Sequence, residues 1–106
     1  MRTGEFSKTF GKTPRNRIIE FFLEMRELDF AVGDVAKEIK LNRATMYINI
    51  RELYKEGIII KTRKISGGQM YGLNMTNKKV KVMLKCFFNV LDSIVEEKKN
   101  GHRNSA

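Results

Sequence analysis

The side chains best placed to do chemistry in this sequence are cations. The chain of 106 residues carries 21 Lys and Arg against 12 Asp and Glu, which gives a formal net charge of +9. Residues 58–75 hold three of the cations, Lys61, Arg63 and Lys64, and no acid at all. An excess of positive charge attracts polyanions. The composition therefore indicates a polyanionic partner, either a nucleic acid or an anionic membrane surface.

The remaining charge is unevenly distributed. Residues 1–17 and 98–106 carry net charges of +4 and +3, whereas residues 18–40 carry −3. A fold that turns this acidic segment away from the basic ones would have one positive face. Residues 1–12 and 99–106 lack apolar periodicity, so we expect a basic flexible N-terminal arm and a flexible basic tail.

Residue types that usually catalyse reactions or bind metals are scarce and isolated. The single histidine, His102, lies in a polar stretch, and the single cysteine, Cys86, follows an apolar pattern that favours a buried thiol. Gly67-Gly68 lacks the downstream Lys-Ser or Lys-Thr and the helix of a phosphate-binding loop. The acidic residues show no ligand spacing. We therefore expect no catalytic set, no metal site and no cofactor, and hence no enzyme.

Length and composition limit the class of protein. A chain of 106 residues corresponds to one domain, and 42% hydrophobic residues are enough for a packed core. One cysteine cannot form an intramolecular disulfide. No run approaches 18 consecutive apolar residues, and the polar N-terminus lacks the apolar segment of a signal peptide. We expect a cytoplasmic protein with no membrane association.

Helical periodicity appears in four segments. Thr13-Pro14 begins the first, which ends near Leu28, with an inner face of Ile18, Ile19, Phe22, Leu23 and Met25 and an outer face of Glu20, Glu24 and Glu27. The second covers residues 32–39, with Val35, Ala36 and Ile39 inward. Asn42 caps the third, residues 43–56, whose inward residues are Met46, Ile50 and Leu53. The last covers residues 78–98.

The period changes after Gly57. Residues 58–65 are β-branched and partly alternating, residues 66–69 form a turn with a Gly-Gly tip, and residues 70–73 return as a second strand. Residues 29–31 are too short for a helix and form an extended link. The predicted fold class is therefore mainly α with a small β-hairpin (α+β), in the order α, short β, α, α, β, β, α.

Two short helices joined by a tight turn form a helix-turn-helix, and a basic hairpin follows it here. Together these elements resemble the winged helix-turn-helix DNA-binding regulators, the broad class of small bacterial and archaeal proteins that includes the MarR, ArsR and PadR groups. The resemblance covers residues 13–73 and rests on residues 34–39, 41–47, 51–59 and 69–71. Relatives often have Ser and Pro where this chain has Asn42 and Ala44, and a polar residue in place of Ile48.

The resemblance implies a DNA-binding domain at residues 13–76 whose third helix, residues 43–56, reads double-stranded DNA in the major groove. Arg43 would then contact guanine, Ala44, Thr45 and Ile48 would meet thymine methyl groups, and Tyr47 and Arg51 would hold phosphates. The wing, residues 58–73, would lie on the DNA backbone or enter the minor groove through Lys61, Arg63, Lys64, Gly67, Gly68 and Gln69.

The last predicted helix, residues 77–98, has an apolar stripe wider than a one-sided surface helix needs. Because exposed apolar patches usually mark an interface, we expect an added C-terminal dimerisation helix that makes a homodimer. The interface residues would be Val80, Met83, Leu84, Phe87, Phe88, Val90, Leu91, Ile94 and Val95.

Three functions are compatible with these features. The first is a sequence-specific transcriptional regulator, such as a repressor that protects one palindromic site. The second is a plasmid or viral partition or replication protein that coats DNA and gives a spreading footprint. The third is a winged-helix protein-interaction module, against which Arg43 and Arg51 argue because acidic residues would be expected on its recognition face.

Overall fold

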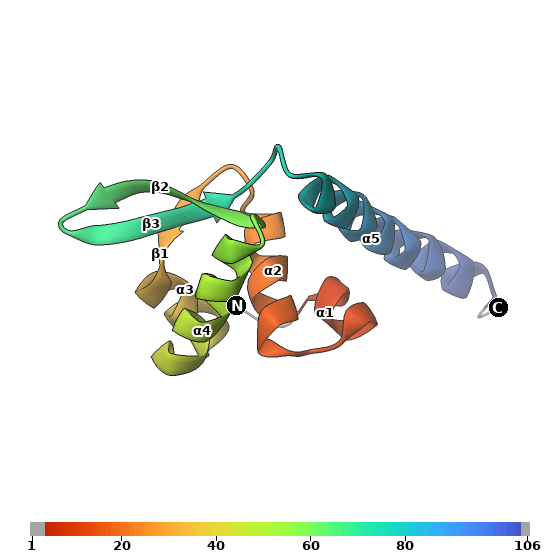
Figure 1. The fold of residues 1–106 in the computed structure, drawn as a ribbon. Coiled ribbons are helices and arrows are strands. Elements are labelled where there is room, and N and C mark those ends of the chain that lie inside the picture. The colour runs from red at the N-terminus through yellow and green to blue at the C-terminus, as the bar shows by residue number, and fades with distance from the viewer. Residues whose placement is uncertain (1–3, 105–106) are drawn as a thin grey trace.

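The computed structural model describes the backbone of residues 4–104 and the side chains of residues 4–97. Three strands form one small sheet beside helices α1–α4, and α5 extends away from them (Figure 1). This is the mainly α fold with a β-hairpin that the sequence predicted, with one further short helix at the N-terminus. The elements are α1 (Glu5–Phe10), α2 (Pro14–Glu24), β1 (Asp29–Ala31), α3 (Val32–Ile39), α4 (Arg43–Lys55), β2 (Ile59–Ile65), β3 (Gly68–Leu73) and α5 (Lys78–Asn104).

Helix α2 is the centre of the fold. Thr13 begins it as predicted, because its hydroxyl accepts a hydrogen bond from the backbone N–H of Asn16 at 3.1 Å, and Pro14 occupies the first helical position. All six residues from 18 to 23 are buried, and α2 contacts α1, α3, α4, α5 and β3. A surface helix buries only one stripe, so α2 is a core helix.

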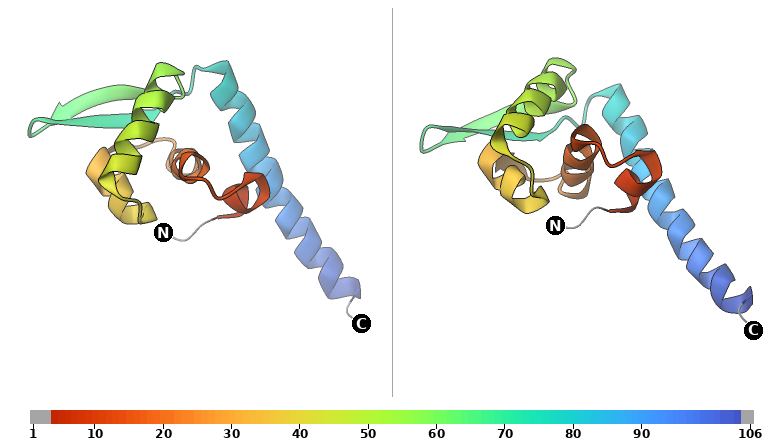
Figure 2. Two further views of the ribbon diagram at one scale, coloured as in Figure 1. Left: turned by 60° about the horizontal axis from the view of Figure 1, so that its bottom comes forward. Right: turned by 90° about the horizontal axis from the view of Figure 1, so that it is seen from below.

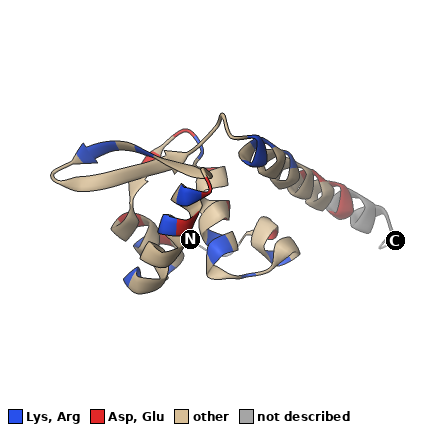
Figure 3. Cartoon of the chain, viewed as in Figure 1, with Lys and Arg blue, Asp and Glu red and all other residues tan. Residues whose placement is uncertain are grey.

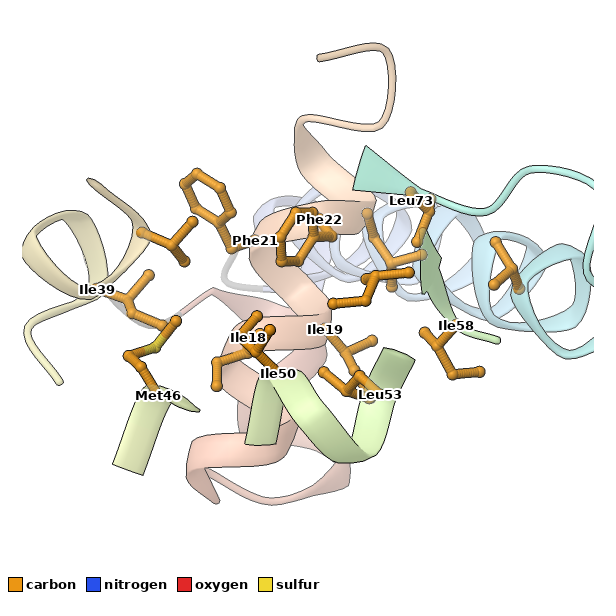
Figure 4. Packing of buried hydrophobic residues seen from close by; sticks show 14 of the residues in the cluster. Ile18, Ile19, Phe21, Phe22, Ile39, Met46, Ile50, Leu53, Ile58 and Leu73 are labelled. Carbon is orange, nitrogen blue, oxygen red and sulfur yellow. The ribbon is translucent and has the colours of Figure 1, made fainter. Parts of the chain in front are cut away.

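One hydrophobic core joins the other elements to α2 (Figure 4). Burial of each large apolar side chain in it stabilises the fold by about 1.5–3 kcal/mol. The inward positions predicted for the second and third helices are confirmed: all of them are buried, namely Val35, Ala36 and Ile39 on α3 and Met46, Ile50 and Leu53 on α4.

Part of the segment expected as a basic flexible arm, residues 5–10, is helical, and residues 1–3 of that segment lie outside the described residues. The chain folds onto α2 as the helix α1, and Glu20, which was expected on the outer face of α2, is only 4% exposed. The Glu20 carboxylate accepts hydrogen bonds from the backbone N–H groups of Gly4 and Phe6, both at 3.0 Å, and of Ser7 at 3.4 Å, and from the Ser7 hydroxyl at 2.9 Å. A carboxylate at a helix N-terminus satisfies free N–H groups and interacts favourably with the helix dipole.

We expect Glu20→Ala to lower the free energy of unfolding by about 2 kcal/mol or more, because hydrogen bonds to a charged group each contribute about 1.5–3 kcal/mol and the α1 donors would lose their acceptor. Urea unfolding followed by circular dichroism measures the change. Glu27→Ala, at an exposed position just after α2, is the matched control. Equal stability of the two variants would contradict the anchoring role of Glu20.

The turn between α3 and α4 is set by the backbone at Lys40. This residue adopts a left-handed conformation with a φ of 58°, and the next N–H, that of Leu41, donates to the Ala36 carbonyl at 3.0 Å. The Leu41 side chain packs against the core. The Arg17 guanidinium donates to the Ile39 carbonyl, and a cation at a helix C-terminus is favourable.

The sheet has the strand order β1-β3-β2, with both pairs antiparallel. The segment expected to be an extended link is thus its third strand, β1. The hairpin tip is shorter than predicted, because Gly68 already pairs with Ile65 in the ladder. Ser66 and Gly67 alone form the turn, with positive φ angles of 49° and 80°, the conformation of a two-residue type I′ turn.

Helix α5 begins on the core and ends away from it (Figure 2). Asn77 caps its start, accepting the N–H of Lys79 at 2.7 Å, while its side-chain amide donates to the Gly57 carbonyl after α4 at 3.0 Å. Phe87 is buried, with its ring centroid 6.5 Å from that of Phe6 in α1.

The far end of α5 differs from the expectation of a helix ending at residue 98. The helix continues to Asn104 through most of the expected tail, whose last two residues, 105 and 106, lie outside the described residues. Among the described residues, no helix has the length and apolar character required to cross a bilayer.

Candidate nucleic-acid interface

The start of α4 is fixed by the cap that the sequence predicted. The Asn42 side-chain oxygen accepts a hydrogen bond from the N–H of Thr45 at 2.8 Å. Because α4 begins at this point, the side chain of Thr45 is half-buried. Residues 43–51 include no Asp or Glu. The side chains left exposed on this face are Arg43, Ala44, Tyr47, Ile48 and Arg51.

Arg43 lies against the start of α3. A Cβ atom on Gly33 would lie 2.9 Å from the Nη2 atom of Arg43, so the guanidinium packs closely against this glycine. A hollow of about 310 Å³ opens beside it, lined on the wing side by Gly68, Gln69 and Tyr71. The start of α4 and the wing therefore form one continuous surface.

The wing presents its first strand, β2, to solvent. Every residue from 60 to 65 is exposed, and the register of β2 on β3 shifts between Lys61 and Lys64. The Gln69 side-chain amide donates to the carbonyls of Arg63 at 3.1 Å and Met70 at 3.0 Å. This amide therefore supports the irregular part of the hairpin. At the tip, a side chain added to Gly67 would meet nothing within 4 Å.

Arg63 is held on the back of the wing. Its Nε and Nη2 atoms donate to the Asp29 carboxylate at 2.9 and 3.1 Å, and the Thr62 hydroxyl donates to the same carboxylate at 2.5 Å. These side chains cross β3 at Gly72, where a Cβ atom would lie 3.2 Å from the Thr62 methyl carbon and 3.7 Å from the Asp29 Cβ. We call Asp29, Thr62 and Arg63 the clasp, since they join the two outer strands over the glycine.

The clasp changes the acidity of its carboxyl group. Hydrogen bonds from the Arg63 guanidinium and then from the Thr62 hydroxyl lower the pKa of Asp29 from 3.8 to about 2. The same pair raises the pKa of Arg63. No local pattern in the sequence indicates this pairing, because the two partners lie in different strands and are separated by β3 in the sheet.

We expect the clasp to stabilise the protein in a pH-dependent way. A carboxyl group whose pKa is lower in the folded state stabilises the fold above its unfolded pKa, about 4, and loses this effect as the pH falls toward about 2. The difference in Tm between the wild type and Asp29→Asn should therefore shrink progressively below about pH 4. Thermal unfolding across this range measures it, with Asp92→Asn on α5 as control. If this difference in Tm stays constant with pH, the folded state does not favour the ionised form of the Asp29 carboxyl group.

Cations mark β2, α4 and the start of α5 (Figure 3). Two acidic side chains near them, Glu56 and Asp29, are paired. Arg15 donates to Glu56, at the end of α4, at 2.7 and 2.9 Å, and these hydrogen bonds lower the pKa of Glu56. Asp29 is paired in the clasp. These pairs neutralise two of the acidic groups in this region, whereas Glu52, next to Arg51 on α4, is exposed.

The apolar stripe of α5 is covered only in its first half. Val80, Leu84 and Phe87 are buried by the rest of the chain, and Met83, Val90 and Ile94 are half-buried. The exposed fractions of the other three expected interface residues are larger, at 42% for Phe88, 40% for Leu91 and 53% for Val95. The Arg26 guanidinium lies 4.9 Å from the centre of the Phe88 ring.

The remaining candidate groups are isolated. Cys86 is a half-buried free thiol, and His102 lies in the part of α5 whose side chains are outside the described residues. In the described part of the chain, no group of three or more His, Cys, Asp or Glu side chains is arranged to hold a metal ion.

No protein-family model matches the chain, and no curated protein matches it in sequence. Solved structures do match it in fold. A mutant of MepR from Staphylococcus aureus, bound to an oligodeoxyribonucleotide, superposes with a TM-score of 0.62 over 95% of this chain and 78% of its own, at 14% identity. Reduced HlyU from Vibrio cholerae gives 0.59 over 81% and 84%, at 16% identity.

A third solved structure is the homodimeric winged helix-turn-helix DNA-binding domain of a possible ArsR-family regulator from Mycobacterium bovis. Its TM-score is 0.60 over 88% of this chain and 81% of its own, at 19% identity. At this level of identity the similarity is one of fold. The chain thus has the winged helix-turn-helix fold that the sequence predicted, with α3 and α4 as the helix-turn-helix and β2–β3 as the wing.

Proposed function

We propose that this protein is a sequence-specific, double-stranded DNA-binding transcriptional regulator. The observation that carries the proposal is the shared surface of α4 and the wing. There an acid-free helix face lies beside a hairpin that bears exposed lysines. Structures with this fold include a transcription regulator of a multidrug efflux pump, MepR, and its mutant bound to an oligodeoxyribonucleotide.

In this proposal α4 enters the major groove, which is wide enough for a helix and shows a distinct donor and acceptor pattern at each base pair. Arg43 stands at the first helical position, where recognition helices reach base edges, and contacts guanine. Ala44 and Ile48 meet thymine methyl groups, with Thr45 at the edge of this face. Tyr47 and Arg51 hold phosphates.

The wing contacts the DNA backbone or the minor groove. Lys61 and Lys64 supply the charge, and the open tip at Gly67 lets the protein backbone approach the DNA backbone closely. Arg63 contributes in another way, because the clasp holds its guanidinium on Asp29. We therefore assign Arg63 to fixing the hairpin, with Gln69 supporting the adjacent irregular register.

We expect Arg43→Ala to weaken specific binding by about 1–3 kcal/mol and to relax the preference at one base pair in each half-site. A selection from a random DNA library first defines the preferred site, and titrations on that site and on random DNA then measure both effects. Lys85→Ala, which removes an exposed cation from α5, is the control. Equal weakening on both DNAs would assign Arg43 to a phosphate.

We further propose that the distal half of α5 makes a homodimer. Phe88, Leu91 and Val95 follow one another at intervals of three and four residues, so they lie on one helix face, and all three are exposed. Exposed apolar patches usually mark an interface. A two-fold dimer would place two copies of α4 about 34 Å apart, one turn of DNA, and match a palindromic site.

Sedimentation at micromolar concentrations tests the dimer. We expect the wild type to sediment as a dimer and Leu91→Glu to sediment as a folded monomer, because a carboxylate cannot be buried unpaired at the interface. Asn89→Glu is the matched control, since positions two residues apart lie on opposite sides of a helix. Phe87 is unsuitable for this test because it is buried within its own chain. A monomeric wild type would refute the dimer.

The length of the footprint tests the mode of binding. A dimeric regulator protects one palindromic site, whereas a protein that coats DNA extends its protection as its concentration rises. We expect a single bounded footprint on the selected site.

A further inference from the structure

We infer that the cleft between α4 and the wing is a seat for one phosphodiester of the DNA strand that passes between the major groove and the wing. This inference rests on the proposed function and adds to it two tyrosines, Tyr54 and Tyr71, that the sequence motif did not assign to binding. The cleft has a volume of about 340 Å³ and is lined by Tyr47, Ile50, Arg51, Tyr54, Lys55, Lys61 and Tyr71.

The lining has the chemistry of an anion site. It contains three cations and no acid. Within the described part of the chain, the hydroxyls of Tyr47, Tyr54 and Tyr71 have no hydrogen-bond partner. Ammonium, guanidinium and phenol groups are the usual side-chain donors to phosphate oxygens in protein–DNA complexes. Phosphate oxygens would therefore meet both charge and free donors in this cleft.

Aromatic packing fixes the position of the central cation. The Lys61 ammonium lies 4.8 Å from the centre of the Tyr54 ring, and the Tyr54 and Tyr71 rings meet edge to face with their centroids 6.3 Å apart. Lys61 and Tyr71 are also partners across the β2–β3 ladder. Contacts of both kinds are attractive. Tyr54 therefore joins the recognition helix to the wing and holds Lys61 at the cleft.

The cleft is too open for a small ligand. A ligand pocket buries about 70–90% of the surface of its occupant. Tyr47 and Tyr54, which line this cleft, are themselves 50% and 42% exposed, so the cleft does not enclose a small molecule to that extent. The lining is also continuous with the exposed face of α4, which carries Tyr47 and Arg51. A polymer that runs across the surface fits this shape and charge better than an enclosed molecule does.

The two faces of β3 separate the wing cations into two roles. Successive side chains of a strand point to opposite faces, so Tyr71 lies toward the cleft and Gly72 toward the clasp. Arg63 is paired with Asp29 on the clasp side, and Lys61 is held on the cleft side. Lys61 should therefore contribute to phosphate binding where Arg63 does not.

Titrations over a range of salt concentrations test this assignment on the selected duplex. Each lost phosphate contact should flatten the slope of log K against log salt by about 0.9 per subunit. We expect this change for Lys61→Ala and little change for Arg63→Gln, with Lys85→Ala as control. Tyr54→Phe keeps the ring beneath Lys61 and removes one hydroxyl, so it should weaken binding about threefold to tenfold.

Duplexes with a single neutral methylphosphonate at successive positions locate the seat. We expect wild-type binding to weaken at one phosphate in each half-site between the two grooves, and Lys61→Ala to lose this sensitivity while it keeps the others. If Lys61→Ala has the same salt slope and the same methylphosphonate profile as the wild type, the cleft does not bind a phosphate through Lys61 and this inference is refuted. The proposed function is not affected by that result. A wild type that binds no duplex would overturn both.

Discussion

Helix α2 has no face turned to solvent over residues 18–23, and the positions of its neighbours follow from that burial. A helix covered on all sides needs partners all around it, and α1, α3, α4, α5 and β3 supply them. One of the six buried residues is a carboxylate, Glu20, and a buried charge without partners costs several kcal/mol. The donors come from α1 and the residue before it, so the short N-terminal helix is a requirement of the core.

Two glycines that carry no chemistry themselves lie directly against side chains of the proposed DNA surface and of the clasp. Gly33 leaves room for the Arg43 guanidinium beside α3, and Gly72 lets the clasp close over β3. The clasp joins β2 to β1 on one face of the sheet, and the Tyr54–Tyr71 contact joins β3 to α4 on the other. The hairpin is therefore attached to the helix α4. The two basic elements therefore present their charges in one arrangement before any partner binds.

The parts of the fold that follow from local rules could be predicted from the sequence. Thr13 and Asn42 indicate the starts of their helices through capping, and helical spacing indicates the burial of Met46, Ile50 and Leu53. The exposed face of α4 then follows by elimination, so most of the candidate site on that helix was predictable.

The parts that depend on distant residues could not be predicted in this way. Helix α1 has six residues, too few to form a stable helix alone, and it is held by the Glu20 carboxylate, which helical periodicity assigns to the outer face. The pairing of Arg63 with Asp29 depends on the order of the strands in the sheet. The cleft at Tyr54 likewise depends on how the wing folds back onto α4.

The contact between Phe6 and Phe87 has a consequence for how the chain reaches its folded state. The two rings are far apart in sequence, and contacts between distant residues slow folding because loop closure costs entropy before the contact forms. During synthesis, α1 and α2 leave the ribosome long before Phe87, so the apolar surface that α5 covers stays open until that helix has emerged. A nascent chain that already holds the helix-turn-helix and the wing therefore still has an incomplete core.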